Sequence, residues 1–203
     1  MSARAPDPTL ELRRRALEVA QSWRAALDLD ALIAPHVADL TGAVDLVAIG
    51  KAAPEMCGAA SRLLGQRVRR RFVVSDVPAE SDPGVLALIG EHPVPGRHSE
   101  EAGYRLFEFL ERTDGADTTV FLVSGGASSV CVAPAPPITL EDLAAVFREA
   151  LALGWDVTRL NHLRAATSLI GGGAVLRRVR SARSRSLIMV DNALEGAPWV
   201  ASA

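Results

Sequence analysis

The chain of 203 residues is 49% hydrophobic and 23% charged, which suits one globular domain of ordinary composition. Its 22 basic residues nearly balance its 24 acidic ones and only 4% of its residues are aromatic, so nucleic-acid binding is the least favoured function. The sequence shows neither an apolar stretch long enough to span a membrane nor the apolar core of a signal peptide, and we expect a cytoplasmic protein with no membrane partner. Cys57 and Cys131 match no zinc or redox spacing, so we expect both to be small buried residues.

Segments with helical and strand-like patterns alternate along most of the chain. The helical patterns predict helices over residues 8–27, 30–36, 52–65, 99–112, 139–154 and 156–168, with an arginine-rich helix after residue 173. Short apolar or β-branched runs predict strands over residues 45–50, 71–74, 85–89, 118–123 and 186–190. Ser99, Thr139 and Asp156 are candidate N-caps.

This alternation predicts a single α/β domain over residues 1–203, in which residues 1–40 form a helical N-terminal segment. We expect an open, largely parallel sheet with helices on both faces, a Rossmann-like arrangement of three layers. Three predicted strands end in polar residues: Gly50 and Lys51, the loop 124–129, and Asp191 with Asn192. Because ligands bind at the carboxyl ends of parallel strands, these residues predict one polar site on that rim.

Lys51 is the only lysine, so the other 21 of the 22 basic residues are arginines. It stands between a buried strand and a helix start, where an ammonium group could hold a phosphate or neutralise a transferring phosphoryl group. A solvated lysine without function is the alternative.

The loop 124–129, with the sequence SGGASS, is the most specific of the three strand ends. Gly125 and Gly126 let the backbone approach a ligand and present amides to an anion, while Ser124, Ser128 and Ser129 add hydroxyl groups. It matches neither a phosphate-binding Walker loop nor the nucleophile elbow of a hydrolase. A tight turn without function is the alternative.

Three further polar residues are candidates for the same rim. His92 lies in a loop stiffened by two prolines, and Asn161 and Arg164 are three residues apart on one helix face, so both could reach one ligand. Each of the three has an ordinary structural explanation when considered alone.

Taken in order, these motifs resemble the N-terminal domain of the glycerate 2-kinase family, in which this domain precedes a so-called MOFRL domain. The family's VGKAA, GHPVP and SGGGSA motifs are similar to residues 49–53, 91–95 and 124–129, and its N-x-x-R segment is similar to residues 161–164. The family transfers the γ-phosphate of ATP to the 2-hydroxyl of D-glycerate with a divalent cation. The resemblance therefore implies ATP and Mg²⁺ as cofactors and a small hydroxy acid as substrate.

Carried over to this chain, the resemblance implies that Lys51 is the catalytic lysine and that residues 124–129 bind a phosphate or the substrate. His92, Asn161 and Arg164 would line the same cleft, and Asp191 would bind the metal or orient the hydroxyl group.

The sequence also departs from the family. Ala165 and Ala166 replace a Lys-His pair, and Gly171 replaces a lysine. The last residues resemble a family segment inside the first domain, so we expect a truncated domain without the MOFRL domain and its catalytic arginine. We then expect a homodimer or a complex with a separately encoded second domain to complete the site.

The leading hypothesis is an ATP-dependent small-molecule kinase, a transferase that resembles glycerate 2-kinase. One alternative is a non-catalytic module that binds a nucleotide or another anion, or that regulates a partner. The other alternative is the same site recruited to a different reaction in a biosynthetic pathway.

Overall fold

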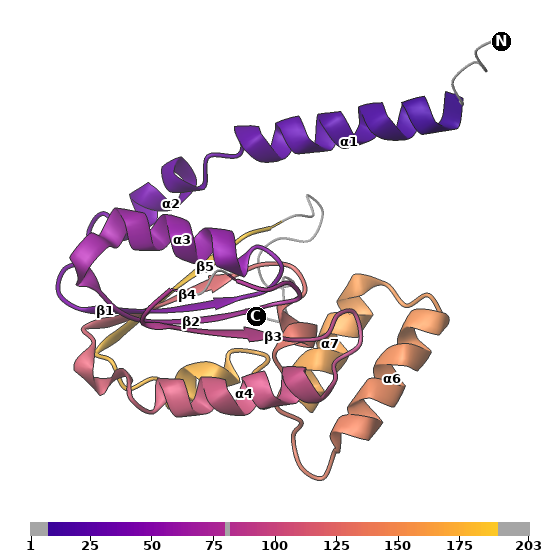
Figure 1. The fold of residues 1–203 in the computed structure, drawn as a ribbon. Helices are drawn as coiled ribbons and strands as arrows, with labels where there is room; N and C mark the ends of the chain where they lie inside the picture. Colours follow the sequence, from indigo (N-terminus) through magenta and orange to yellow (C-terminus); the bar gives the residue numbers. More distant parts are fainter. Residues whose placement is uncertain (1–7, 80–81, 191–203) are drawn as a thin grey trace.

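In the computed structural model of the chain, the described residues are 8–79 and 82–190. Their five strands form one sheet in which all neighbouring strands are parallel, in the order β3-β2-β1-β4-β5 (Figure 1). The strands are β1 (Val44–Ile49), β2 (Val68–Ser75), β3 (Val85–Ile89), β4 (Thr118–Val123) and β5 (Arg183–Ile188). The α-helices are α1 (Pro8–Ala26), α2 (Leu29–Val37), α3 (Ala53–Leu64), α4 (Arg97–Leu110), α5 (Ala127–Val130), α6 (Leu140–Ala152) and α7 (Val157–Thr167). Short 3₁₀ helices lie at η1 (Gly65–Arg67), η2 (Thr113–Gly115) and η3 (Ala174–Arg178).

The sheet is covered on both faces, which confirms the predicted three-layer α/β fold. The side chains of β1 are all buried, and they alternate between the two faces as the pleat requires. Leu46 and Ala48 join the core under α2 and α3, whereas Val47 and Ile49 join the core over α4. Helices α3 and α4 lie on opposite sides of the sheet in Figure 1. Cys57 belongs to the first core and Cys131 to the second, so the prediction that both are buried is confirmed.

The order of the strands creates a switch point between β1 and β4. After β1 the chain passes through α3 to β2 and β3, all on one side of β1. It then returns through α4 on the other face to β4, on the opposite side of β1. The loops after β1 and β4 therefore leave the sheet in opposite directions, which is where open α/β sheets bind ligands.

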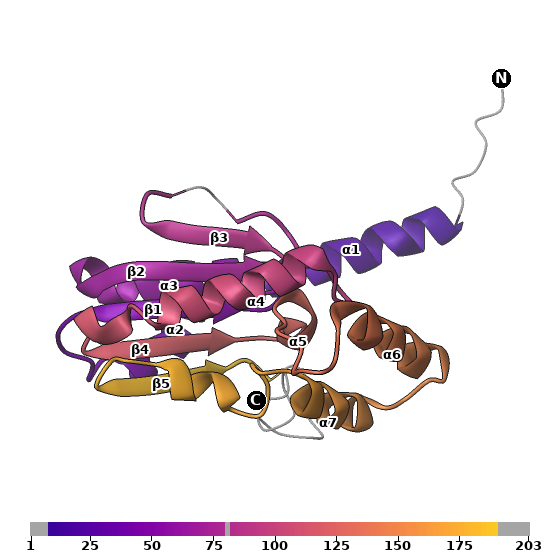
Figure 2. The same cartoon turned by 90° about the horizontal axis from the view of Figure 1, so that it is seen from below.

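Helices α6 and α7 lie beyond the carboxyl ends of the strands, next to that switch point (Figure 2). Thr139 and Asp142 form a reciprocal capping box at the start of α6, and Asp156 accepts a hydrogen bond from the backbone N–H of Arg159 at the start of α7. These contacts confirm both predicted caps.

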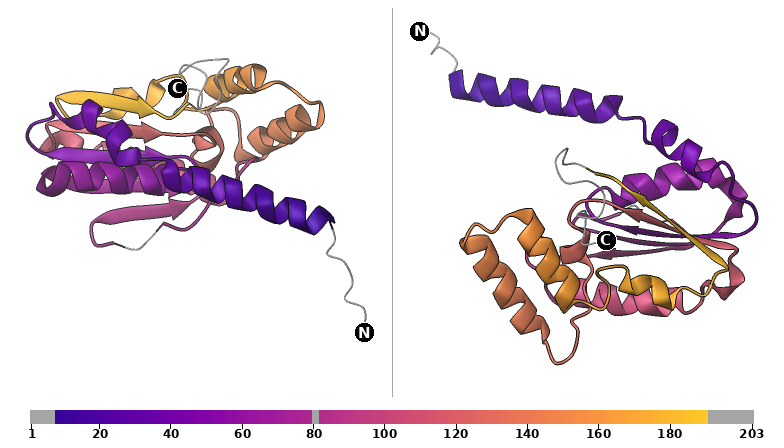
Figure 3. Two further views of the ribbon diagram at one scale, coloured as in Figure 1. Left: turned by 90° about the horizontal axis from the view of Figure 1, so that it is seen from above. Right: turned by 180° about the vertical axis from the view of Figure 1, so that it is seen from behind.

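Helix α1 extends away from the sheet and its covering helices (Figure 3). It confirms the predicted first helix, yet Leu10 and Leu12 are 63% and 72% exposed. No helix in the described part of the chain is long and apolar enough to cross a membrane.

Two local predictions are wrong. Helix α4 begins at Arg97 with Gly96 as its N-cap, and Ser99 lies buried inside the helix. Its first turn is capped by Glu91, whose carboxylate accepts hydrogen bonds from the Ser99 N–H at 2.8 Å and the Ser99 hydroxyl at 2.7 Å. This long-range cap has no local sequence pattern.

The arginine-rich segment is also different from the prediction. It forms only the five-residue η3, and the last strand begins at Arg183 rather than at residue 186. Arg185 of this strand is bound to Asp39 by two hydrogen bonds, at 2.5 and 2.8 Å.

A buried carboxylate joins the amino-terminal ends of β1 and β2. Asp45 is fully buried, and its Oδ2 accepts hydrogen bonds of 2.6 Å from the guanidinium groups of both Arg69 and Arg70. Arg70 also packs over the ring of Phe109, at 4.4 Å from its centre. The two arginines compensate for the loss of water around the carboxylate.

We expect Asp45→Asn to lower the free energy of unfolding by about 2–3 kcal/mol, because it leaves two partly buried guanidinium groups without their anion. Urea unfolding followed by circular dichroism measures this change. Asp30→Asn, which removes the exposed Asp30–Arg62 pair, is the matched control and should have a smaller effect. Equal effects of the two substitutions would contradict the stabilising role of Asp45.

Candidate functional site

The loops that follow β1 and β4 are locked together at the switch point. The N–H of Lys51 donates a hydrogen bond of 2.9 Å to the carbonyl oxygen of Gly125, and the N–H of Ala52 donates one of 3.0 Å to the hydroxyl of Ser124. Gly50 has a φ of +120°, and a Cβ atom there would clash with Ser124. Only glycine therefore allows this approach, which holds the backbone of Lys51 against the loop 124–129.

Gly126 lies beside two of the predicted site residues. It has a φ of +88°, and a Cβ atom at this position would lie 3.3 Å from Cγ of Lys51 and 3.2 Å from Cδ2 of His92. The fold therefore brings Lys51 and His92, which are 41 positions apart in the sequence, next to the same glycine.

The hydroxyl groups of Ser124 and Ser129 form hydrogen bonds that position the loop 124–129. Ser124 is buried and accepts the hydrogen bond from Ala52. Ser129 is also buried, and its hydroxyl donates to the carbonyl oxygen of Pro93 at 2.9 Å. Ser128 is partly exposed and lines the neighbouring cavity. Ser124 and Ser129 therefore fix this loop to the loops that follow β1 and β3.

The amide groups available to an anion come from the loop rather than from the start of α3. The N–H groups of Ala52 and Ala53 already donate to Ser124 and Gly50, and Pro54 has no N–H group. In contrast, the N–H groups of Gly125 and Gly126 have no acceptor among residues 8–79 and 82–190.

Arg164 of α7 is a half-buried cation. Its guanidinium donates hydrogen bonds to Oδ1 of Asn161 at 3.1 Å and to the hydroxyl of Ser129 at 3.4 Å, and it stacks over the ring of Phe147 at 4.9 Å. Its Nε atom is buried and finds no hydrogen-bond partner in the described part of the chain. Burial lowers the pKa of Arg164 to about 10, so it remains charged at pH 7.

The charge of Arg164 has no carboxylate within ion-pair distance among the described residues. A buried charge is normally paired, because removing it from water costs several kcal/mol. Asn161 is itself buried, and its hydrogen bond with Arg164 holds the predicted pair of residues together.

His92 lies within the field of both cations. Partial burial lowers the pKa of His92 below the ordinary 6.5, and the positive charges of Lys51 and Arg164 lower it further. The negative charge of Asp76 raises this pKa, but by less than Lys51 lowers it. The imidazole is therefore mainly neutral at pH 7. Lys51 and Arg164 therefore make the rim beside the loop 124–129 electropositive, and the neutral ring of His92 lies within their field.

The described residues offer an anion site but no metal site. Two amides and two cations suit phosphate oxygens, as ATP would require. No group of three or more histidine, cysteine or acidic residues could hold a metal ion within residues 8–79 and 82–190. Asp191, the predicted catalytic and metal-binding residue, lies outside these residues.

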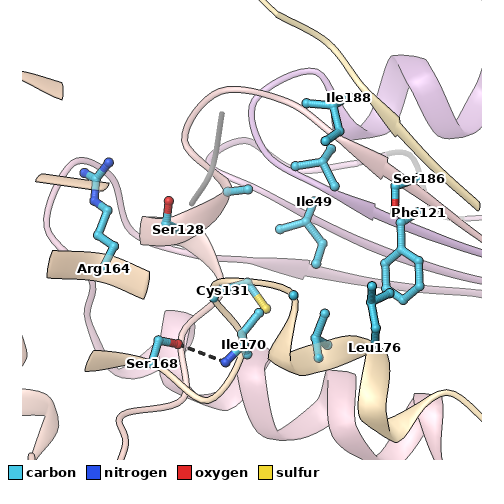
Figure 4. Close-up of a pocket in the computed structure, with 15 residues that line it drawn as sticks. Ile49, Phe121, Ser128, Cys131, Arg164, Ser168, Ile170, Leu176, Ser186 and Ile188 are labelled. Atoms are coloured by element: carbon cyan, nitrogen blue, oxygen red, sulfur yellow. Dashed lines mark hydrogen bonds between the residues drawn. The ribbon is translucent and has the colours of Figure 1, made fainter. Parts of the chain in front are cut away.

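An apolar cavity of about 130 Å³ adjoins the rim (Figure 4). Ser128 and Arg164 lie toward one end of it in Figure 4, and Phe121 and Leu176 lie toward the other. Sequence reasoning did not find this cavity, because its apolar residues have the same pattern as core residues. Those on the strands and the following segments include Ile49, Phe121, Val123, Cys131, Ile170, Val175, Leu176 and Ile188.

Comparisons with known proteins agree with the motifs of this rim. The family model described as a domain of unknown function (DUF4147) matches residues 10–203. D-glycerate 2-kinase of Thermotoga maritima is 30% identical over 188 residues, which cover 91% of this chain and 45% of the relative. The chain belongs to the glycerate 2-kinase family. Within this family it corresponds to the N-terminal domain, so the resemblance of its motifs is confirmed.

Other members of the glycerate 2-kinase family show the same partial coverage. Human glycerate kinase is 30% identical over 163 residues, which cover 72% of this chain and 31% of the relative. The crystal structure of glycerate kinase from Thermotoga maritima matches with a TM-score of 0.77 and 27% identity, over 95% of this chain and 47% of that one. The chain thus spans less than half the length of these relatives.

We expect Gly126→Ala to disturb the glycerate 2-kinase-like rim, because its methyl group would press on Lys51 and His92. Gly154→Ala is the matched control, since Gly154 also has a positive φ, +65°, but no atom within 4 Å of its Cβ position. Both should lose about 1–2 kcal/mol of unfolding free energy from backbone strain. Only Gly126→Ala should shift the NMR signals of the His92 ring, and an equal response of both variants would contradict this packing.

Lys51→Met should raise the pKa of His92, because it removes the larger of the two cationic effects on that ring. An NMR titration of the imidazole measures the change, and Lys51→Arg, which keeps the charge, should leave the pKa low. Since the folded-state pKa lies below 6.5, the contribution of His92 to stability is present above pH 6.5 and is lost as the pH falls through the folded value. An unchanged pKa in Lys51→Met would show that the two side chains do not interact.

Proposed function

We propose that this chain acts in phosphoryl transfer from ATP to the hydroxyl group of a small 2-hydroxy acid such as D-glycerate. The observation that carries the proposal is the convergence of Lys51, Arg164 and two loop amides around His92 at the switch point of the sheet, with no acceptor for either amide among the described residues. Phosphoryl transfer depends mainly on positioning and charge stabilisation, which these groups can supply. The names of the relatives support the same class of reaction.

Each group has a distinct part in this proposal. Lys51 stabilises the negative charge on the transferring phosphoryl group, and the N–H groups of Gly125 and Gly126 hold phosphate oxygens. The bond from the γ-phosphorus to its bridging oxygen breaks while a bond to the substrate hydroxyl oxygen forms. His92, which is neutral at pH 7, accepts the hydroxyl proton, and ADP leaves.

A second domain or a second chain completes the site in this proposal. The relatives are more than twice as long as the segment that this chain matches in them. The chain would supply the phosphate-binding half of a cleft, and a homodimer or a separately encoded domain would supply the other half.

A non-catalytic anion-binding module is the second candidate. Position 171 carries glycine, and a Cβ atom there would lie 3.0 Å from Cα of Ala165. Gly171, which replaces a lysine of the family, therefore lies against Ala165, which replaces part of the family's Lys-His pair. Loss of the larger side chains at both positions fits a protein that has lost this part of the catalytic surface.

Calorimetric titration with ATP and Mg²⁺ tests the shared part of both candidates. Lys51→Met should weaken ATP binding about 10- to 100-fold, because it removes a charge-assisted hydrogen bond to phosphate. Arg62→Met, near the C-terminal end of α3 and with its side chain 64% exposed, should leave the affinity within about twofold. If both variants bind ATP like the unchanged protein, the proposed site is wrong.

Phosphotransfer to D-glycerate separates the two candidates. The reaction is measured with the chain alone and with the second domain of a glycerate 2-kinase added. Turnover that Lys51→Met abolishes is the result expected for the kinase. ATP binding without turnover in either setting supports the binding module instead.

A further inference from the structure

We infer that the 2-hydroxy acid recognised by this chain carries an apolar substituent, which lies in the cavity between β4, β5 and η3. This inference rests on the proposed function and narrows the class of its substrate. It combines two observations, the cavity itself and the half-buried cation at one end of it.

The cavity has the size and surface of a pocket for a small apolar group. Its volume of about 130 Å³ is close to that of an engineered cavity of about 150 Å³ that binds benzene. Phe121, Val175 and Ile188 are among the residues that line it, and its polar lining residues are three serines and Arg164. A group of four to six carbon atoms would therefore fit, whereas the CH₂OH group of glycerate would leave most of the space empty.

The cation at the end of the cavity selects for a carboxylate. Arg164 lines the cavity, and its charge has no carboxylate partner in the described part of the chain. Its Nε atom is buried without a hydrogen-bond partner among the same residues. A carboxylate bound beside the guanidinium would compensate the charge of Arg164, because guanidinium groups form strong charge-assisted hydrogen bonds with carboxylates.

The connection to the rim orients such a ligand. Ser129 is hydrogen-bonded both to Arg164 and to the carbonyl oxygen of Pro93, the residue after His92. An acid held by Arg164, with its substituent in the cavity, would then have its hydroxyl group on the side of His92 and Lys51. Ser128, which lines the same cavity, lies one residue before Ser129 in the loop 124–129.

Calorimetric titrations of the full chain with two acids test this inference. Lactate carries a methyl group and 2-hydroxy-4-methylpentanoate carries an isobutyl group, so we expect the second to bind at least about tenfold more tightly. Arg164→Gln should weaken both acids by a similar factor and preserve their ratio. Equal affinities of the unchanged protein for the two acids would overturn the inference.

Two matched variants show whether the cavity causes the preference. Ser186→Phe places a ring over the cavity from an exposed position of β5, and it should weaken only the branched acid. Ser184→Phe lies two residues earlier on the same face of β5, outside the cavity lining, and should change neither acid. Leu176→Trp, from a lining residue that is 41% exposed, should act like Ser186→Phe and serves if that variant folds poorly.

The remaining outcomes are also decisive. If Ser186→Phe weakens ATP binding and leaves both acids unchanged, the cavity holds the nucleotide base and the inference is wrong. If the branched acid is preferred while Lys51→Met leaves ATP binding unchanged, the inference holds and the proposed phosphoryl transfer fails. Acid binding requires no turnover, so the two proposals are tested separately.

Discussion

The functional surface depends on the close contact between the loops that follow β1 and β4. Gly50 must be glycine for Ser124 to reach the N–H of Ala52, and this contact places the backbone of Lys51 against the carbonyl oxygen of Gly125. Gly126 then leaves the space that Lys51 and His92 share. The glycines thus permit the close approach of the two loops, and the buried serines hold them together. The N–H groups of Gly125 and Gly126 have no acceptor in the described part of the chain. A fixed arrangement of donors is what electrostatic catalysis requires, because little reorganisation then accompanies binding.

Much of the fold could be predicted from the sequence, since its elements have strong local patterns. β4 matches its predicted limits of residues 118–123, and the caps at Thr139 and Asp156 are where a short polar side chain precedes a helical pattern. The polar residues after β1 and β4 could be assigned to one rim, because parallel strands end on the same edge. The order of the strands in the sheet has no local sequence pattern, so only the structure shows it. The same holds for the Glu91 cap of α4 and for the contact of Asp45 with two arginines, which join residues far apart in the chain.

The sequence could predict which residues belong to the candidate site, but not which way each side chain faces or how deeply it is buried. A motif such as SGGASS cannot show that Ser124 and Ser129 face inward, because that depends on which partners the tertiary structure offers. Likewise, Arg164 has the sequence context of an ordinary helix surface. Its charge becomes half-buried, without a carboxylate partner among residues 8–79 and 82–190, only once α7 packs beside the loop. The apolar cavity next to it is invisible in the sequence for the same reason. The roles of Asp191 and of a second domain remain predictions from the resemblance.

We propose that the switch point between β1 and β4 is a phosphate site with Lys51 at its centre. The most direct measurement is a crystal structure of the chain with a non-hydrolysable ATP analogue. We expect a phosphate group within hydrogen-bond distance of Nζ of Lys51 and of the N–H groups of Gly125 and Gly126. Phosphate groups bound elsewhere on the domain, with these three donors facing solvent, would contradict it.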